Sequence, residues 1–438
     1  MGVAEPDKRI TTRRAIEALR GGVPNRDAVS QLGCSHPEVE TRFDEMLRLT
    51  TESLTTESTV PGILIAGDFG SGKSHLLEYL QNKALERNFA CSKVVISKET
   101  SLADPARLFR AAVGELRVSG KIGAGIANVA EGLALKPSYA GFYRWAAPDV
   151  SGLTPHFAGS LHVFQFGGDI EFRSRIERFW AGDPLTNRDL GEKLKLLGQQ
   201  TTYPLQKLPL ARHLAYQRFR FLAKLISAAG YAGWVILIDE MELVGQYSFK
   251  SRARAYGEFA RWMGELANSP DGSFPGLGVV AAITTDFEKA VITGGKMDGE
   301  YVPGKLRASL RDDDHALATI AERGMRFMRK SANRLPPLSE EQVLRTHDDL
   351  RGIYERAFGW TPPVAARLPA IQTSSVMRSF VRRWITEWDI GRLYPGSSFE
   401  PEETPLAPAS YREDKDLEAE EATQEFEPAA PLDNNSVP

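Results

Sequence analysis

The sequence has few of the features that mark secreted, disulfide-bonded or membrane-spanning proteins. Its 438 residues include only two cysteines, Cys34 and Cys91, without C-x-x-C spacing, and seven scattered histidines that form no ligand pair. This usage suits a reducing cytosol and argues against a disulfide framework and structural zinc. The longest apolar stretches, such as residues 234–238, are too short to cross a bilayer, and no N-terminal hydrophobic signal region exists. We therefore expect a cytoplasmic protein without membrane contact.

Charge is distributed unevenly along the chain. The net charge is −3, but the segment from Glu400 to the C-terminus carries twelve acidic and two basic residues, which leaves +7 for residues 1–399. A modestly basic body is compatible with an anionic partner such as DNA. A solvated surface joined to a disordered acidic tail explains the same charges without any partner.

Residues 67–74 read Gly-Asp-Phe-Gly-Ser-Gly-Lys-Ser and match the Walker A pattern G-x-x-x-x-G-K-[ST]. The glycines let backbone N–H groups point at phosphate oxygens, Lys73 reaches the β- and γ-phosphates, and the Ser74 hydroxyl is a magnesium ligand. The apolar run 63–66 before the loop predicts a buried strand, and the apolar spacing of residues 76–84 after it predicts a helix. This strand–loop–helix context is the one that phosphate binding needs.

The alternative interpretation of this loop is a chance match. Multiplying approximate residue frequencies gives about 0.02 expected matches in a chain of this length, before the flanking strand and helix are required. We therefore predict that the following residues bind nucleotide: Gly67, Asp68, Phe69, Gly70, Ser71, Gly72, Lys73, Ser74 and His75.

A second motif, residues 235–240, reads Val-Ile-Leu-Ile-Asp-Glu. At the carboxyl end of a strand beside the loop, Asp239 would hold magnesium through its water shell, and Glu240 would polarise the water that attacks the γ-phosphorus. A kinase does not need that second carboxylate, so the pair favours hydrolysis. A buried strand followed by a solvated acidic turn is the alternative.

The next apolar run, residues 278–283, ends in polar residues. In ATPases with a strand inserted between the loop strand and the Asp-Glu strand, a polar side chain at this point senses the γ-phosphate. We predict this role for Thr285, with Thr284 as the alternative, and a simple strand-end cap also fits.

Three arginines are candidates for contact with phosphate. Arg378 lies in the first turn of an amphipathic helix and could reach the nucleotide from a helical lid. Arg307 and Arg311 lie where a ring-forming ATPase would present an arginine to its neighbour. Surface arginines are common, so a solvent-facing position is the alternative for all three.

With these residues identified, the chain resembles the ATP-binding proteins of BREX phage-defence systems, specifically the BrxD family. The resemblance covers residues 10–396, nearly everything but the tail. Four stretches carry it: 12–25, 67–78, 92–99 and 237–243. More distantly, the layout is similar to that of the initiator-like AAA+ ATPases.

The resemblance implies an α/β fold: a P-loop NTPase, AAA+-like, with a parallel-sheet core, a large helical insertion and a C-terminal helical lid. It implies ATP and Mg²⁺ as cofactors, adenine held near Val23 and Pro24, and sensor roles for Thr285 and Arg378. It also implies phage-defence partners such as a helicase, a methyltransferase and a phosphatase-like protein. No clean arginine-finger motif is visible, which leaves a homo-oligomer open.

The motifs divide the chain into four predicted segments. Residues 1–55 form an N-terminal helical segment that contributes to the nucleotide site. Residues 56–337 form the P-loop ATPase core, with the helical insertion at about 104–230, and residues 338–397 form the lid. Residues 398–438 are too acidic and too rich in proline to bury a core, so we expect a disordered tail.

Two functions follow from this interpretation. In the first, an ATPase couples ATP binding and hydrolysis to remodelling of DNA or of a protein–DNA complex. In the second, ATP binding switches a scaffold that recruits other defence proteins, and hydrolysis only resets it. A small-molecule kinase shares the loop, but the sequence has no acceptor-site signature.

Overall fold

Five strands form one parallel sheet. The computed structural model describes residues 5–22, 25–131, 133–269, 271–337, 339–364, 377–397 and 410–417. Within these ranges the strands are β1 (Ile63–Gly67), β2 (Ala90–Val95), β3 (Trp234–Asp239), β4 (Leu277–Thr284) and β5 (Asn333–Arg334). They are hydrogen-bonded in the order β2-β3-β4-β1-β5, and every pair is parallel. The predicted α/β class with a parallel sheet is therefore confirmed, and β4 is inserted between β1 and β3.

Side chains of the central strands alternate between two hydrophobic cores, because successive residues of a strand point to opposite faces. Leu64 and Ile236 belong to one core, whereas Ile65 and Val235 belong to the other. Helices α5 (Pro105–Gly114) and α12 (Ala211–Ala228) cover the first face, and α3 (Pro37–Thr56) and α4 (Lys73–Glu86) cover the second. Both faces are buried, which explains why the strands are continuous apolar runs in the sequence.

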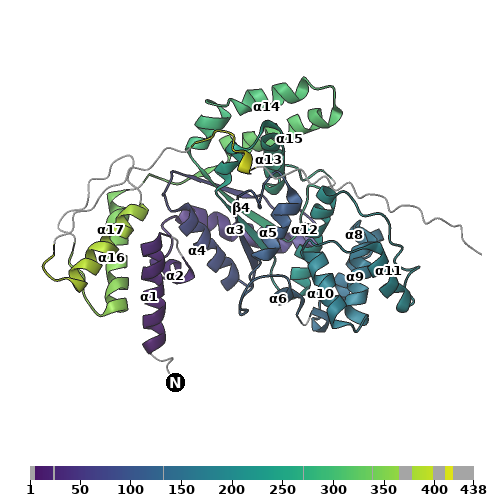
Figure 1. Cartoon of the computed structure of the whole chain (residues 1–438), viewed down its shortest axis with the longest axis horizontal. Helices are drawn as coiled ribbons and strands as arrows, with labels where there is room; N and C mark the ends of the chain where they lie inside the picture. The colour runs from purple at the N-terminus through teal and green to yellow at the C-terminus, as the bar shows by residue number, and fades with distance from the viewer. Residues whose placement is uncertain are drawn as a thin grey trace, which may run out of the picture.

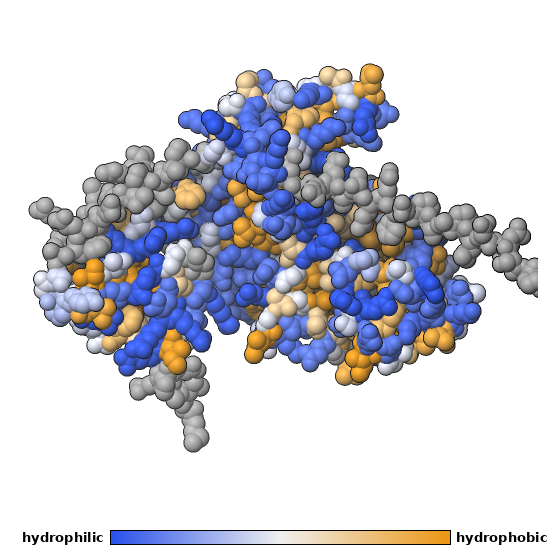
Figure 2. Space-filling view, in the orientation of Figure 1, coloured by the Kyte–Doolittle hydropathy of each residue, from blue (hydrophilic) through white to orange (hydrophobic). Residues whose placement is uncertain are grey.

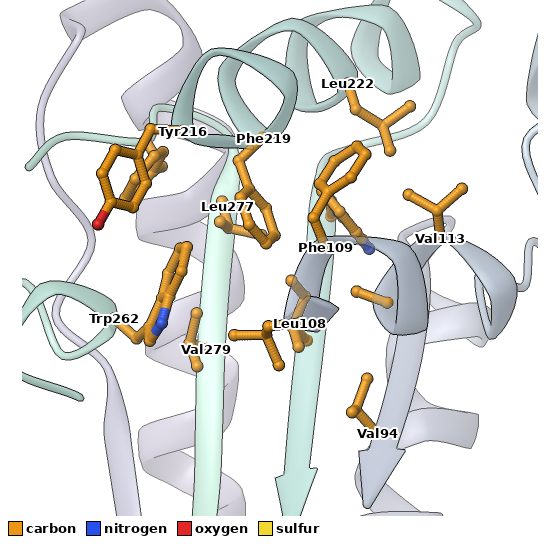
Figure 3. Packing of buried hydrophobic residues seen from close by; sticks show 14 of the residues in the cluster. Val94, Leu108, Phe109, Val113, Tyr216, Phe219, Leu222, Trp262, Leu277 and Val279 are labelled. Atoms are coloured by element: carbon orange, nitrogen blue, oxygen red, sulfur yellow. The ribbon is translucent and has the colours of Figure 1, made fainter. Parts of the chain in front are cut away.

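Aromatic rings join α5 and α12 to the sheet (Figure 3). The Phe219 ring lies 4.9 Å from that of Phe109, 5.7 Å from that of Trp234 and 4.6 Å from that of Trp262, measured between ring centroids. All four side chains are buried. Since α5 precedes the inserted helices and α12 follows them, this cluster attaches both ends of the insertion to the core.

The residues between α5 and α12 form a helical layer at one side of the sheet (Figure 1). Its elements are α6 (Ala127–Ala130), η1 (Leu133–Leu135), α7 (Tyr139–Trp145), α8 (Pro148–Ser151), α9 (Pro155–Phe166), α10 (Ile170–Ala181) and α11 (Asn187–Leu196). Helices therefore occupy much of the stretch where the sequence predicts an insertion.

A second helical group combines elements from both ends of the chain (Figure 1). It comprises α1 (Glu5–Gly21), α2 (Arg26–Leu32), α16 (Glu340–Phe358) and α17 (Met377–Leu393), which share a third hydrophobic core. Arg20 of α1 pairs with Asp389 of α17 at 2.6 Å, and the Tyr354 hydroxyl of α16 donates to the same carboxylate. The Ser339 side chain caps α16 in a capping box with Gln342. The predicted N-terminal segment is thus divided, because α3 packs on the sheet instead.

A third helical group follows β3 and β4. It comprises α13 (Phe249–Trp262), α14 (Asp298–Arg307) and α15 (Asp312–Lys330), and the short turns nearby are η2 (Met241–Gln246) and η3 (Glu288–Ile292). None of the helices in the described ranges is both long and apolar enough to span a membrane. The face shown in Figure 2 is mainly hydrophilic, with hydrophobic residues in scattered groups.

Candidate nucleotide site

The loop between β1 and α4 depends on glycine at three positions. Gly70 and Gly72 have φ values of +75° and +92°, in the left-handed region that disfavours side chains. A Cβ atom at Gly67 would lie 2.5 Å from Ser71 Oγ and 3.1 Å from Leu335 Cδ1. Two of these glycines therefore supply backbone freedom, and the third supplies space beneath the loop.

The Lys73 ammonium is buried under this loop. It donates hydrogen bonds to the carbonyl oxygens of Gly67 at 2.8 Å and Asp68 at 3.1 Å, and the residue is 8% exposed. Burial lowers the pKa of Lys73, whereas nearby carboxylates, first Glu242 and then Asp239, act to raise it. The lysine of the loop and the acid after β3 therefore lie within electrostatic reach of each other.

Sheet register explains this proximity. β4 pairs with β1 so that Gly67 lies opposite Thr284, and it pairs with β3 so that Ile238 lies opposite Ala281. The carboxyl ends of the three parallel strands thus meet at one edge of the sheet, where α/β proteins bind ligands.

Two carboxylates at the end of β3 lie in different environments. Asp239 is 4% exposed, and its Oδ1 atom accepts a hydrogen bond from the backbone N–H of Glu240 at 3.0 Å. Glu240 has a φ of +57°, which is rare for a residue with a side chain and is often found at functional sites. Partial burial and the charge of Asp239 raise the pKa of Glu240, while Arg378 and Lys73 act to lower it.

A third carboxylate, Glu242, was not predicted. It lies in η2, and within the described ranges its buried Oε2 atom has no hydrogen-bond partner. Burial raises the pKa of Glu242, and Lys73 opposes this shift. The stretch Asp-Glu-Met-Glu at 239–242 places this glutamate close to Asp239 in the sequence. Its position near the loop depends on the short turn after β3, which the sequence pattern does not reveal.

The polar end of β4 contacts both the loop and a distant segment. The Thr285 hydroxyl donates a hydrogen bond to Asp68 of the loop, so the predicted sensor residue contacts a predicted nucleotide-binding residue. The Thr284 hydroxyl is buried and lies 3.2 Å from the Tyr411 hydroxyl instead. Both threonine hydroxyls are therefore hydrogen-bonded, that of Thr285 to the loop and that of Thr284 to the distant segment.

Arg378 reaches this site from α17, far away in the sequence. Its charge acts on Glu240, and a Cβ atom at Gly22 would lie 3.2 Å from its side chain. The arginine therefore lies between the end of α1 and the carboxylates after β3. The predicted adenine contacts, Val23 and Pro24, lie outside the described residues.

Three other predicted site residues make contacts away from the carboxylates or are exposed to solvent. The His75 ring lies 3.1 Å from the Gly33 carbonyl oxygen, so its side chain faces the segment after α2. The Phe69 side chain is 59% exposed at the loop. Arg307 pairs with Glu322 of α15 at 2.6 Å.

One family model matches residues 8–134 and 207–384, well over half of the chain, and describes the BREX system ATP-binding proteins BrxC/D. The chain belongs to this family. No curated protein and no solved structure gives a significant match. Membership supports ATP as the ligand and a role in a BREX system.

The two matched ranges contain the site of this BrxC/D family chain. The loop, the carboxylates after β3, the end of β4 and Arg378 all fall within them. Residues 135–206, which hold α7 to α11, fall outside, as do residues 385–438. The matched ranges therefore include the residues of the candidate site, whereas helices α7 to α11 and the strongly acidic C-terminal region lie outside them.

The packing beneath the loop makes Gly67 sensitive to a single methyl group. We expect Gly67→Ala to weaken ATP binding at least tenfold, because the added Cβ would contact Ser71 Oγ at 2.5 Å and displace the loop. Gly304→Ala in α14, where an added Cβ meets no atom within 4 Å, is the matched control. Calorimetric titration of both variants measures the effect, and equal affinities would contradict the assigned role of Gly67.

Proposed function

We propose that this chain is an ATPase of the BrxD type, with an AAA+-like core, that acts in the cytoplasm as part of a BREX phage-defence system. One observation carries the proposal: the Lys73 ammonium lies within electrostatic reach of Asp239, at the sheet edge where Glu240 follows. A triphosphate held by the loop would meet a metal-binding acid and a water-polarising acid together. The strand order, with β4 between β1 and β3, supports the AAA+-like assignment.

Ser74 and Asp239 would hold magnesium at this site. Ser74 follows Lys73 in the first turn of α4, and Asp239 ends the buried strand β3. The unpartnered oxygen of Glu242 fits a nearby cation, because a buried carboxylate needs a compensating charge or donor. Bound magnesium would neutralise charge on the β- and γ-phosphates.

The residues around the γ-phosphate would act together in hydrolysis. Glu240 would accept a proton from the attacking water, whose oxygen bonds to the γ-phosphorus as the bond to the bridging oxygen breaks and ADP leaves. Lys73 would hold the phosphate charge. Thr285 would orient the water, and Arg378 would contribute positive charge from α17.

Hydrolysis would drive remodelling of DNA or of a protein–DNA complex. The +7 charge of residues 1–399 supports an anionic partner, and membership of the family supports other defence proteins as partners. A nucleotide-gated scaffold is the second candidate. It is favoured by the helical layer α7 to α11, which lies outside the matched ranges and offers surface for protein contacts.

The role of Glu240 can be separated from binding. We expect Glu240→Gln to abolish ATP turnover while nucleotide affinity stays near that of the unmodified chain, because the amide cannot accept the proton from water. Phosphate release and a binding titration measure the two effects. Glu86→Gln, on the exposed end of α4, is the control. Hydrolysis by Glu240→Gln at the parental rate would show that another group polarises the water.

Lys73→Ala tests the phosphate contact. Without the ammonium, the phosphate oxygens lose a charge-assisted partner, so we expect ATP affinity to fall below detection in a calorimetric titration. Lys250→Ala, an exposed lysine on α13, should bind as the unmodified chain does. Unchanged affinity of Lys73→Ala would contradict the proposed binding mode.

DNA distinguishes the two candidate functions. If hydrolysis remodels DNA, we expect duplex DNA to raise the ATP turnover severalfold at moderate salt, with the stimulation falling as salt screens the phosphates. Turnover should be measured at two salt concentrations with and without duplex. Absence of any stimulation, together with nucleotide-dependent binding of a defence partner, would support the scaffold instead.

A further inference from the structure

Residues 410–417 lie beside the nucleotide site although they come from the acidic C-terminal region. The predicted disordered tail included them, but the structure describes them as packed on the core, where Tyr411 and Leu417 contact its hydrophobic residues. In Figure 1 this short yellow segment lies beside α13. We call it the strap; its last residues form the turn η4 (Lys415–Leu417).

One residue of η2 holds the strap at two points, its first residue and its middle. The Gln246 side-chain amide donates to the Ser410 carbonyl oxygen at 2.8 Å, and the Asp414 backbone N–H donates to the Gln246 carbonyl oxygen at 2.9 Å. η2 is the turn that begins directly after Glu240. The strap is therefore fixed to the turn that carries Glu242 and directly follows Asp239 and Glu240.

Tyr411 contacts the end of β4 and the backbone of η2. Its hydroxyl donates to the Asp286 carboxylate, 3.1 Å from each oxygen, and lies 3.2 Å from Thr284 Oγ1. Its ring packs edge-on against Phe287, with centroids 5.8 Å apart. A Cβ atom at Gly245 would lie 2.7 Å from Tyr411 Cδ1, so glycine at that position makes room for the ring.

Glu413 binds a buried arginine. The Arg252 side chain is 4% exposed and pairs with Glu413 at 2.9 Å. Its other donors bind the Asp298 carboxylate at 2.8 and 3.2 Å and the Tyr247 carbonyl oxygen at 2.6 Å. We call the surface beneath the strap, formed by η2, the end of β4 and Arg252, the groove. It contacts a tyrosine ring and hydroxyl at one point and, two residues later, places a buried cation beside an exposed carboxylate.

The end of β4 connects the strap to the phosphate-binding loop. Thr284 ends the strand, and Thr285 and Asp286 follow in the turn after it. Thr284 and Asp286 contact Tyr411, while Thr285 between them donates to Asp68 of the loop. A displacement of this strand end toward the nucleotide would change both sets of contacts.

We propose that this groove is a docking site for acidic, tyrosine-containing peptide segments, that residues 410–417 occupy it in cis, and that docking slows ATP turnover. The docking itself stands on the contacts above, whereas its effect on turnover rests on the proposed function. The strap joins η2 to the end of β4 and occupies the Thr284 hydroxyl and the Asp286 carboxylate. The chain on both sides of Thr285 is thereby restrained, and releasing the strap frees it.

Turnover of strap variants tests the restraint. We expect Tyr411→Ala and Glu413→Gln to raise the ATP turnover at least threefold, because each removes one contact with the groove. Arg412→Gln, which neutralises the exposed residue between them, should leave turnover unchanged. If the unmodified chain hydrolyses ATP but both strap variants show unchanged or reduced turnover, the strap does not restrain hydrolysis. That result would leave the proposed ATPase function standing.

Binding in trans tests the groove without relying on hydrolysis. A labelled peptide of residues 410–417 should bind the full-length double variant Tyr411→Ala/Glu413→Gln, as measured by fluorescence anisotropy. It should bind the unmodified chain at least tenfold more weakly, because the strap of that chain already fills the groove. The peptide with Tyr411→Phe should bind the double variant more weakly than the unmodified peptide does. Adding the unmodified peptide to the double variant should slow its ATP turnover again. Absence of binding to the double variant would overturn the docking site, whether or not any chain hydrolyses ATP.

Discussion

Burial of the Lys73 ammonium is the constraint on which the rest of the site depends. A buried cation is costly unless carbonyl oxygens and carboxylates surround it. Two carbonyl oxygens of the loop and the acids after β3 provide that environment. The requirement can be met only if the ends of β1 and β3 lie at the same edge of the sheet, which the parallel pairing through β4 ensures. The electrostatics of one side chain and the topology of the sheet therefore support each other.

The inserted strand β4 does more than separate β1 from β3. Its buried residues pack into both cores, and its polar end divides its contacts between the loop and the strap. A strand packed on both faces moves as a rigid element, since interiors are close-packed. Through Thr285 and Thr284, the end of β4 thus joins the loop to the strap.

The sequence predicts the parts of the site that are local in the chain. Glycine spacing, the apolar runs and the Asp-Glu pair indicate the loop, the strands and their polar ends, because each pattern reflects backbone and burial requirements of neighbouring residues. Contacts between distant segments have no such pattern. Glu242 depends on a turn, Arg378 on the packing of α17 against α1, and Tyr411 on a groove lined by three elements. Helices α13 and α14 were missed in the same way, since their apolar residues face partners that only the fold supplies.

The composition of the C-terminal region predicts a disordered tail, but residues 410–417 pack on the core. Acidic, proline-rich segments cannot bury a core of their own, but a short segment needs only one ring and one charge if a groove is already built for them. Tyr411 fills the space that Gly245 leaves, and Glu413 completes the coordination of an arginine that Asp298 has already neutralised in part. Because the strap lies outside the residues matched by the family, while most of the groove lies within them, such a groove could accept other segments of the same chemistry. In the proposed arrangement the matched ranges would hold the nucleotide, and a segment outside them would regulate its turnover.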